Sequence, residues 1–180
     1  VTVPKYLGYR VAGDAAEVRG GGDRAVRLGL EVNAHPPTSV LLALPFAGLD
    51  YRHATLAWNL VSLAALGASL WLLGRGLGVG WSPWALCPLI GLLLLCSPFR
   101  QQMNQGQLNL VLLLLLTLVW VTARSGRPVW CGVFLGLATA VKLFPGFLLL
   151  HFAIHRRWKI VASGLIALVA ITLLTAVVLQ

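Results

Sequence analysis

The sequence predicts an all-α protein built as a polytopic bundle of transmembrane helices. Of its 180 residues, 58% are hydrophobic and only 11% are charged, whereas a soluble domain carries about 25% charged residues. The mean hydropathy is +0.84, and apolar runs of near membrane length recur after residue 50. Basic residues gather in the short segments between these runs. We therefore expect an integral membrane protein.

Net charge and cysteine usage exclude several other classes. The formal charge of +9 could suggest a nucleic-acid partner, but basic residues at span ends are explained by topology and lipid headgroups. Cys87, Cys96 and Cys131 lie in apolar runs without metal-ligand spacing, so we expect inert thiols. We predict no metal-binding residues and no cofactor, and metal dependence stays open because no paired acidic motif is visible. The single methionine is Met103, and Gln180 ends an apolar run. We therefore expect a fragment truncated at both ends.

Residues 1–50 are predicted to form an outer-face loop with a short interfacial helix. The first 35 residues are polar and rich in glycine. The apolar piece Thr38–Leu49 has 12 residues, fewer than the ~20 that a span requires. Pro36 and Pro37 suit a helix start, and Pro45 is expected to kink or end the helix. This helix should therefore lie half buried at the membrane surface.

Residues 51–180 are predicted to form one transmembrane helical region. Its elements are separated by a glycine-rich stop around Arg75 and by basic turns at 124–128 and 155–159. The expected apolar segments are 52–77, 83–99, 107–123, 129–141, 143–154 and 160–179.

The distribution of positive charge decides how residues 129–154 fold. They could form one kinked span, which would divide the basic residues between both sides, or two short helices meeting at Lys142–Pro145. Counted from Arg75 onward and apart from Lys142 itself, the hairpin leaves only Arg100 on the opposite side from six other cations, so the positive-inside rule favours it. The cytoplasmic set would be Arg75, Arg124, Arg127, Arg156, Arg157 and Lys159. The N-terminal loop, the amides described next and Lys142 would then face outward.

A cluster of amides between two apolar runs is the first candidate binding site. Residues 100–109 hold six amides, which are costly in hydrocarbon unless they are partnered. We expect Gln107 and Asn109 in the first turn of the next helix, with Asn104 and Gln105 before it. Amides donate to and accept from sugar hydroxyls, and Gly106 allows close approach of a ligand. The alternative is an ordinary polar loop between spans.

Two basic side chains and a histidine complete the candidate set. Lys142, with Arg100, is a candidate for phosphate binding, because a lysine is a compact point charge. The alternative is that the Lys142 side chain only extends to place its ammonium group at the membrane–water interface and binds no ligand. His35 is either a residue that starts the interfacial helix or an acid/base or hydroxyl-binding group.

Three motifs together resemble membrane glycosyltransferases of the GT-C fold that use polyprenyl-phosphate sugars, and especially glycosyltransferase family 87, the mannosyltransferase-like group. The first is His35-Pro-Pro-Thr-Ser-Val-Leu-Leu-Ala-Leu-Pro45 and the second is Asn104-Gln-Gly-Gln-Leu-Asn109. The third is Gly132-Val-Phe-Leu-Gly-Leu-Ala-Thr-Ala-Val-Lys-Leu-Phe-Pro145, followed by an apolar helix and Arg-Arg-Trp. Their order and spacing over residues 35–159 carry the resemblance.

The resemblance implies transfer of a hexosyl, specifically mannosyl, group from a polyprenyl-phosphate carrier to a glycolipid or glycan acceptor. The reaction would invert the configuration at the anomeric carbon of the sugar, and it would take place on the outer face of a bacterial plasma membrane. An aspartate in the first outer loop would deprotonate the acceptor. Asp14 lies in the corresponding loop, so the base is either Asp14 or a residue upstream of Val1. His35 stands where the family has an aromatic residue.

Two other functions remain open from the residues alone. A transporter or flippase for a lipid-linked or small polar solute also uses broken helices with polar groups near the mid-membrane. A non-catalytic membrane subunit would use the same helices only to pack against partners. Formation of a product from a polyprenyl-phosphate sugar separates the enzyme from both.

Overall fold

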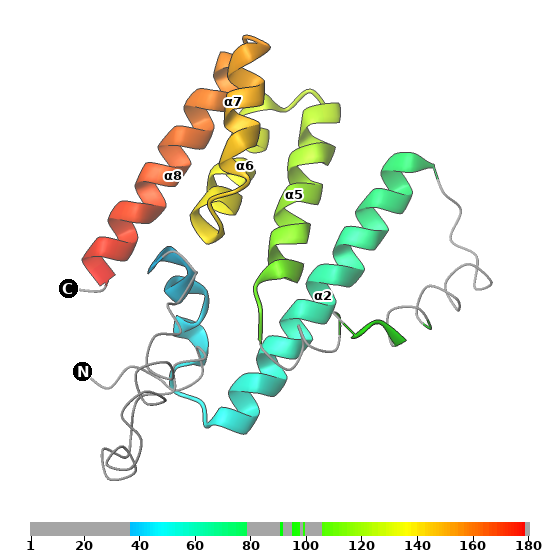
Figure 1. The fold of residues 1–180 in the computed structure, drawn as a ribbon, viewed down its shortest axis with the longest axis vertical. Coiled ribbons are helices and arrows are strands. Elements are labelled where there is room, and N and C mark those ends of the chain that lie inside the picture. The colour runs from blue at the N-terminus through cyan, green and yellow to red at the C-terminus, as the bar shows by residue number, and fades with distance from the viewer. Residues whose placement is uncertain (1–36, 79–90, 92–94, 98, 100–105, 179–180) are drawn as a thin grey trace, which may run out of the picture.

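The computed structural model describes residues 37–78, 91, 95–97, 99 and 106–178, and this part of the chain is entirely helical (Figure 1). It contains two short 3-10 helices and five α-helices, and no strand occurs among these residues. The elements are η3 (Pro37–Leu42), η4 (Leu44–Phe46), α2 (Tyr51–Leu77), α5 (Asn109–Arg124), α6 (Pro128–Val141), α7 (Gly146–Ile154) and α8 (Trp158–Val178). The predicted all-α class is confirmed.

Helix α2 matches the first predicted span to within one residue at its start. It ends at Gly78, whose φ of 70° is the left-handed conformation that glycine adopts at little cost. The glycine-rich stop predicted from the sequence therefore has a direct conformational role. The next predicted span, 83–99, lies largely outside the described residues.

The predicted interfacial helix consists of two 3-10 helices instead of one continuous helix. The amide N–H groups of Phe46, Ala47 and Leu49 each bond to the carbonyl three residues earlier. Pro45 has no N–H to donate to an earlier carbonyl, so a regular α-helical ladder cannot pass through it. The proline thus divides the segment, as expected, and the 3-10 geometry was not anticipated.

The contacts of α6 fix the direction of the last three helices. Gly132 lies against Ile160 and Ser163, and one turn later Gly136 lies against Gly164 and Ala167. Because the contacts advance together along both helices, α6 and α8 are parallel. Helix α7 runs in the opposite direction and contacts both of them (Figure 1). Residues 129–154 are therefore a hairpin of two short helices. The alternative of one kinked span is wrong.

The core lies between α5, α6, α7 and α8. Cys131 and Leu135 of α6 are fully buried and pack with a residue from each of the other three helices. Glycines allow α6 and α8 to approach closely: a Cβ on Gly136 would come within 2.9 Å of the Ala167 Cβ. Small residues at such contacts are typical of membrane helix pairs, where packing replaces the hydrophobic driving force.

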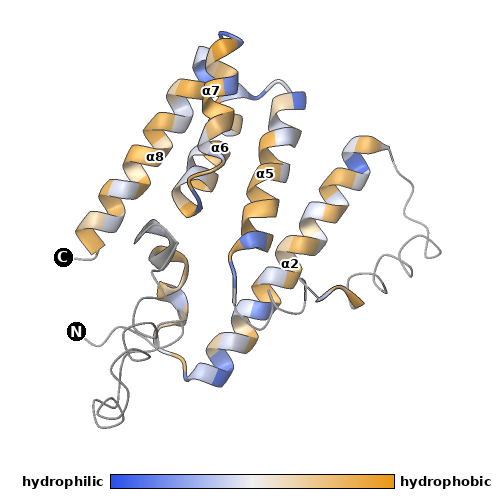
Figure 2. Cartoon of the chain, viewed as in Figure 1, coloured by the Kyte–Doolittle hydropathy of each residue, from blue (hydrophilic) through white to orange (hydrophobic). Residues whose placement is uncertain are grey.

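The surface of the bundle suits a membrane. Helices α2 and α8 have the length and apolar composition of spans, and α5 and α6 are shorter apolar helices. Large apolar side chains face outward, including Leu60 at 67% exposure and Ile166 at 69%. Figure 2 shows apolar residues along the helices and hydrophilic ones gathered at their ends.

Candidate active site at the Lys142 end of the bundle

Lys142 and two amides form a hydrogen-bonded chain at one end of the bundle. The Lys142 Nζ donates to the Asn109 Oδ1 at 2.6 Å, across 33 residues of sequence. The Asn109 Nδ2 in turn donates to the Gln107 Oε1 at 2.7 Å. All three side chains are partly buried. A bond from an ammonium group is charge-assisted and is about twice as strong as one between neutral groups.

Helix ends position these three residues. Helix α6 stops at Val141, and Lys142 follows in extended conformation with φ −145° and ψ 138°, its N–H still bonded to the Ala138 carbonyl. The fully buried Pro145 then begins the return through α7. Helix α5 begins at Asn109, so Gln107 lies just before the helix. The expectation that Gln107 belongs to the first helical turn was wrong, because the turn at Gly106, with φ 63°, delays the helix start.

The segment that carries the proline pair reaches the same end of the bundle. The Thr38 hydroxyl donates to the Ala140 carbonyl, two residues before Lys142, across 102 residues of sequence. The 3-10 helix η3 contacts both α6 and α8, and Figure 1 shows it beside their ends. Described parts of all three sequence motifs therefore meet here. Thr38 had not been singled out from the sequence.

Apolar side chains lie immediately beside the polar chain. Leu143 is 76% exposed, and Phe144 and Phe147 are also exposed, so the turn after Lys142 presents apolar surface. The ammonium group thus stands at a boundary between polar groups and hydrocarbon. A phosphate that carries a long apolar chain requires both kinds of surface.

Buried polar atoms of α2 adjoin the amide segment. A Cβ on Gly106 would lie 3.7 Å from the Trp58 Nε1. This nitrogen, the Asn59 Oδ1 and the Ser62 Oγ are buried and make no hydrogen bond within the part of the chain described. Burial of unpartnered polar atoms is costly, so this part of α2 carries hydrogen-bonding capacity that the described residues leave unused, and its Trp58 lies beside Gly106.

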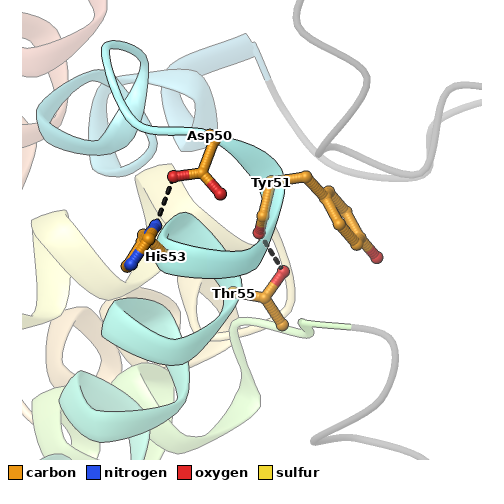
Figure 3. A network of polar contacts seen from close by, with 4 residues as sticks. All are labelled: Asp50, Tyr51, His53 and Thr55. Atoms are coloured by element: carbon orange, nitrogen blue, oxygen red, sulfur yellow. Dashed lines mark hydrogen bonds and ion pairs between the residues drawn. The ribbon is translucent and has the colours of Figure 1, made fainter.

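An aspartate–histidine pair marks the start of α2. The Asp50 carboxylate accepts a hydrogen bond from the His53 ring, as Figure 3 shows. This bond lowers the pKa of the Asp50 carboxyl below its ordinary value of 3.8. Both side chains are largely exposed, so the pair contributes little stability. The i, i+3 spacing at a helix start was the sequence signal for it, and it was missed.

The predicted site residues divide into two groups. Gln107, Asn109 and Lys142 are brought together by the fold. The others lie outside the described residues: Asp14, His35, Arg100, Asn104 and Gln105. Among described residues, no group of three or more His, Cys, Asp or Glu side chains could hold a metal ion.

Fold and site together define a helical membrane protein with a cluster of one cation and two amides at one end of its bundle. The family model described as glycosyltransferase family 87 matches residues 33–180, and the chain belongs to this family. The chain is also similar to a polyprenol-phosphate-mannose-dependent alpha-(1-2)-phosphatidylinositol mannoside mannosyltransferase of Mycobacterium tuberculosis. The two are 30% identical over 155 residues, which cover 78% of this chain and 35% of that protein. The chain thus spans about a third of the length of this relative. No solved structure matches the chain.

Proposed function

We propose that the natural protein containing this chain transfers a hexosyl group, specifically mannosyl, from a polyprenyl-phosphate carrier to an acceptor. Membership of glycosyltransferase family 87 supports the reaction class. The activity named for the M. tuberculosis relative supports a polyprenol-phosphate-mannose donor and a phosphatidylinositol mannoside acceptor. We extend the donor to this protein, together with a glycolipid or glycan as the acceptor.

The observation that carries the proposal is the bond from Lys142 to Asn109. In the transfer, an acceptor oxygen forms a bond to the anomeric carbon while the bond from that carbon to the phosphate oxygen breaks. The acceptor proton passes to a carboxylate base, and the phosphate leaves with an added negative charge. A fixed ammonium group beside that oxygen stabilises the charge as it develops. Asn109 holds the Lys142 ammonium group in place, and Gln107 fixes the Asn109 amide.

The surroundings of Lys142 fit a carrier of this kind. The polyprenyl chain would lie on the exposed apolar surface of Leu143, Phe144 and Phe147. The sugar would lie toward the amide segment, where Asn104, Gln105, Gln107 and Asn109 would bind its hydroxyls. Each part of the donor then meets a surface of matching polarity.

The remaining predicted residues keep their proposed roles. Arg100 would assist Lys142 at the phosphate, and His35 would bind a hydroxyl group or transfer a proton. The general base would be Asp14 or an aspartate encoded upstream of Val1. His35 lies in the first of the three motifs, and Asp14 lies in the loop that corresponds to the first outer loop of the family.

We further propose that the Lys142 end faces the outer side of a bacterial plasma membrane. The six cations at the opposite ends of the helices support this orientation, because basic residues are retained on the cytoplasmic side. Cysteines introduced at Ser39 and Ser125 should react with an impermeant thiol reagent from opposite sides of intact cells. Labelling of both from the same side would contradict the orientation.

The transfer assay uses the intact natural protein in detergent with a radiolabelled polyprenyl-phosphate mannose and a mannolipid acceptor. Lys142→Ala should lower kcat/KM by 100-fold or more, since removal of one stabilising donor in such a site costs roughly 10²–10³ in rate. Lys142→Arg should recover part of the loss. Arg52→Gln removes an exposed cation from the first turn of α2, which lies at the Lys142 end of the bundle, and should leave the rate unchanged. Equal rates for Lys142→Ala and the natural protein would overturn the role of Lys142, and donor binding without product would favour a transporter.

A further inference from the structure

The opposite end of the bundle carries a surface of unpaired cations. We call it the basic end, and it consists of Arg75, Arg124, Arg127, Arg156, Arg157 and Lys159, all of which are exposed. The one acidic residue within the described part of the chain is Asp50, at the start of α2. Arg75 lies in the last turn of that same helix. The basic end therefore has no acidic partner among the described residues, and its charge is available to an external anion.

Two turns of identical geometry build the centre of this surface. In the α5–α6 turn, Gly126 donates to the Ala123 carbonyl and Arg127 donates to the Thr122 carbonyl. In the α7–α8 turn, Arg156 donates to the Ala153 carbonyl and Arg157 to the Phe152 carbonyl. Both are Schellman motifs, in which the residue after the helix cap adopts a left-handed conformation.

The residue in the left-handed position differs between the two turns. The first turn has Gly126 at φ 66°, and the second has Arg156 at φ 56°. Arg156 is the one described non-glycine residue with positive φ. A residue with a Cβ is disfavoured in this conformation, whereas glycine adopts it freely. The second turn therefore carries a cation where glycine would fold more easily, which is the pattern expected when a side chain is retained for function.

Helix packing brings the two turns together. Gly132 of α6 lies against Ile160 and Gly164 of α8, so the parallel first turns of these helices are neighbours. Arg127 directly precedes α6, Arg157 directly precedes α8, and neither helix has an acidic residue in its first turn. The cations of both turns thus converge on one area.

The basic end carries tryptophans of the kind found at the depth of lipid headgroups. Trp130 and Trp158, in the first turns of α6 and α8, are 56% and 63% exposed. The Arg75 guanidinium lies 5.6 Å from the ring centre of Trp71, and that of Arg124 lies 4.9 Å from Trp120. Exposed tryptophans at helix ends are typical of the membrane–water boundary.

We propose that the basic end binds the phosphate of an anionic phospholipid of the adjoining leaflet, with Arg127, Arg156 and Arg157 as its main contacts. The planar guanidinium fork matches phosphate oxygens in a bidentate arrangement. The lipid tails would lie along the apolar flank beside Trp130 and Trp158. This site is separate from the proposed transfer site, and it does not depend on that activity.

Arg156→Gly is the decisive variant because it removes the cation and relieves the disfavoured φ. The intact natural protein is reconstituted in nanodiscs of phosphatidylcholine and phosphatidylglycerol, extracted in mild detergent, and analysed for retained lipid by native mass spectrometry. The natural protein should retain phosphatidylglycerol in preference to phosphatidylcholine. Arg156→Gly should lower that preference about fivefold, the effect of one basic residue near a membrane surface, while the melting temperature stays equal or rises. Arg52→Gln, at the other end of α2, should change neither.

Further arms separate this proposal from its alternatives. Combining Arg156→Gly with Arg127→Gln and Arg157→Gln should abolish the preference, and thiol labelling of a cysteine at Ser125 confirms that each variant keeps its orientation. No preference in the natural protein, or an unchanged preference in the triple variant, would overturn the proposal. Displacement of the lipid by millimolar inorganic phosphate would also overturn it, in favour of a free-phosphate site. A lower melting temperature for Arg156→Gly would overturn the assignment of Arg156 to lipid binding, because it would give this side chain a structural role.

Discussion

Gly136 lies where α6 contacts α8, and its replacement by alanine is expected to destabilise the protein. The added Cβ would overlap the Gly164 carbonyl oxygen and would lie 2.9 Å from the Ala167 Cβ and 3.1 Å from the Leu168 nitrogen. Two of these three atoms belong to the backbone of α8, so rotamer changes cannot remove the overlap and the helices must separate.

The magnitude follows from two opposing terms. Overpacking of a close contact costs about 1–3 kcal/mol, and the upper end applies here because backbone is involved. Alanine recovers about 1 kcal/mol through its higher helix propensity. We therefore expect Gly136→Ala to lower the free energy of unfolding by about 2 kcal/mol.

Gly67 provides the matched control. It lies within α2, and a Cβ there meets no atom within 4 Å. Gly67→Ala should raise the free energy of unfolding by up to about 1 kcal/mol. The assay is unfolding of the purified intact protein by dodecyl sulfate in mixed micelles, monitored by circular dichroism. Equal stability of the two variants would refute the α6–α8 contact as described.

Three further predictions concern the polar end of the bundle. Asn109→Leu removes the acceptor of the hydrogen bond from the Lys142 ammonium group. Because such a charge-assisted bond contributes roughly 1.5–3 kcal/mol, KM for the sugar donor should rise about 10-fold. An unchanged KM in donor titrations would contradict this. Gly106→Ala should lower the free energy of unfolding by about 1–2 kcal/mol, because φ is 63° at this position, and not because a Cβ lacks space. A melting temperature of the variant equal to or above that of the natural protein would contradict this. Asp50 contributes a small amount of stability above pH 3.8, because the hydrogen bond from His53 lowers the pKa of its carboxyl, and this contribution is lost as pH falls through the lowered pKa. The natural protein should therefore melt slightly above Asp50→Asn at pH 6, and the difference should shrink as the pH is lowered; a constant difference would be the contrary result.

The topology could be predicted from the sequence because the positive-inside rule compares how each possible arrangement of the helices distributes basic residues between the two sides of the membrane. The break at Lys142–Pro145 was visible as a lysine and a proline inside an apolar run. The charge count then favoured a hairpin, and the parallel packing of α6 and α8 confirms it. The predicted bounds of α2, α6 and α8 are within two residues of those observed.

Details that depend on backbone conformation could not be predicted in the same way. The amide pattern could not indicate that Gly106 would adopt a left-handed φ and delay α5 until Asn109. Nothing in the residues 155–157 indicates a left-handed conformation at Arg156, because glycine is the usual signal for it.

The candidate site was predictable as a group of residues and not as a set of contacts. Amides and a lysine at the same end of the bundle followed from the topology. The specific bond from Lys142 to Asn109 joins residues that are 33 positions apart, so it depends on how α5 and α6 pack against each other. The bond from Thr38 depends on where η3 docks, and hydrophobic periodicity carries no information on this.

The central claim is that Lys142 binds the phosphate of a lipid carrier, and a binding measurement tests it without requiring the acceptor. Polyprenyl phosphate and the uncharged polyprenol are titrated into the intact protein in nanodiscs, and the shift in melting temperature gives each affinity. We expect Lys142→Ala to weaken the binding of polyprenyl phosphate at least 10-fold, through loss of a charged hydrogen bond of roughly 1.5–3 kcal/mol, and to leave the binding of polyprenol unchanged. Equal affinity of the natural protein and Lys142→Ala for polyprenyl phosphate would contradict it.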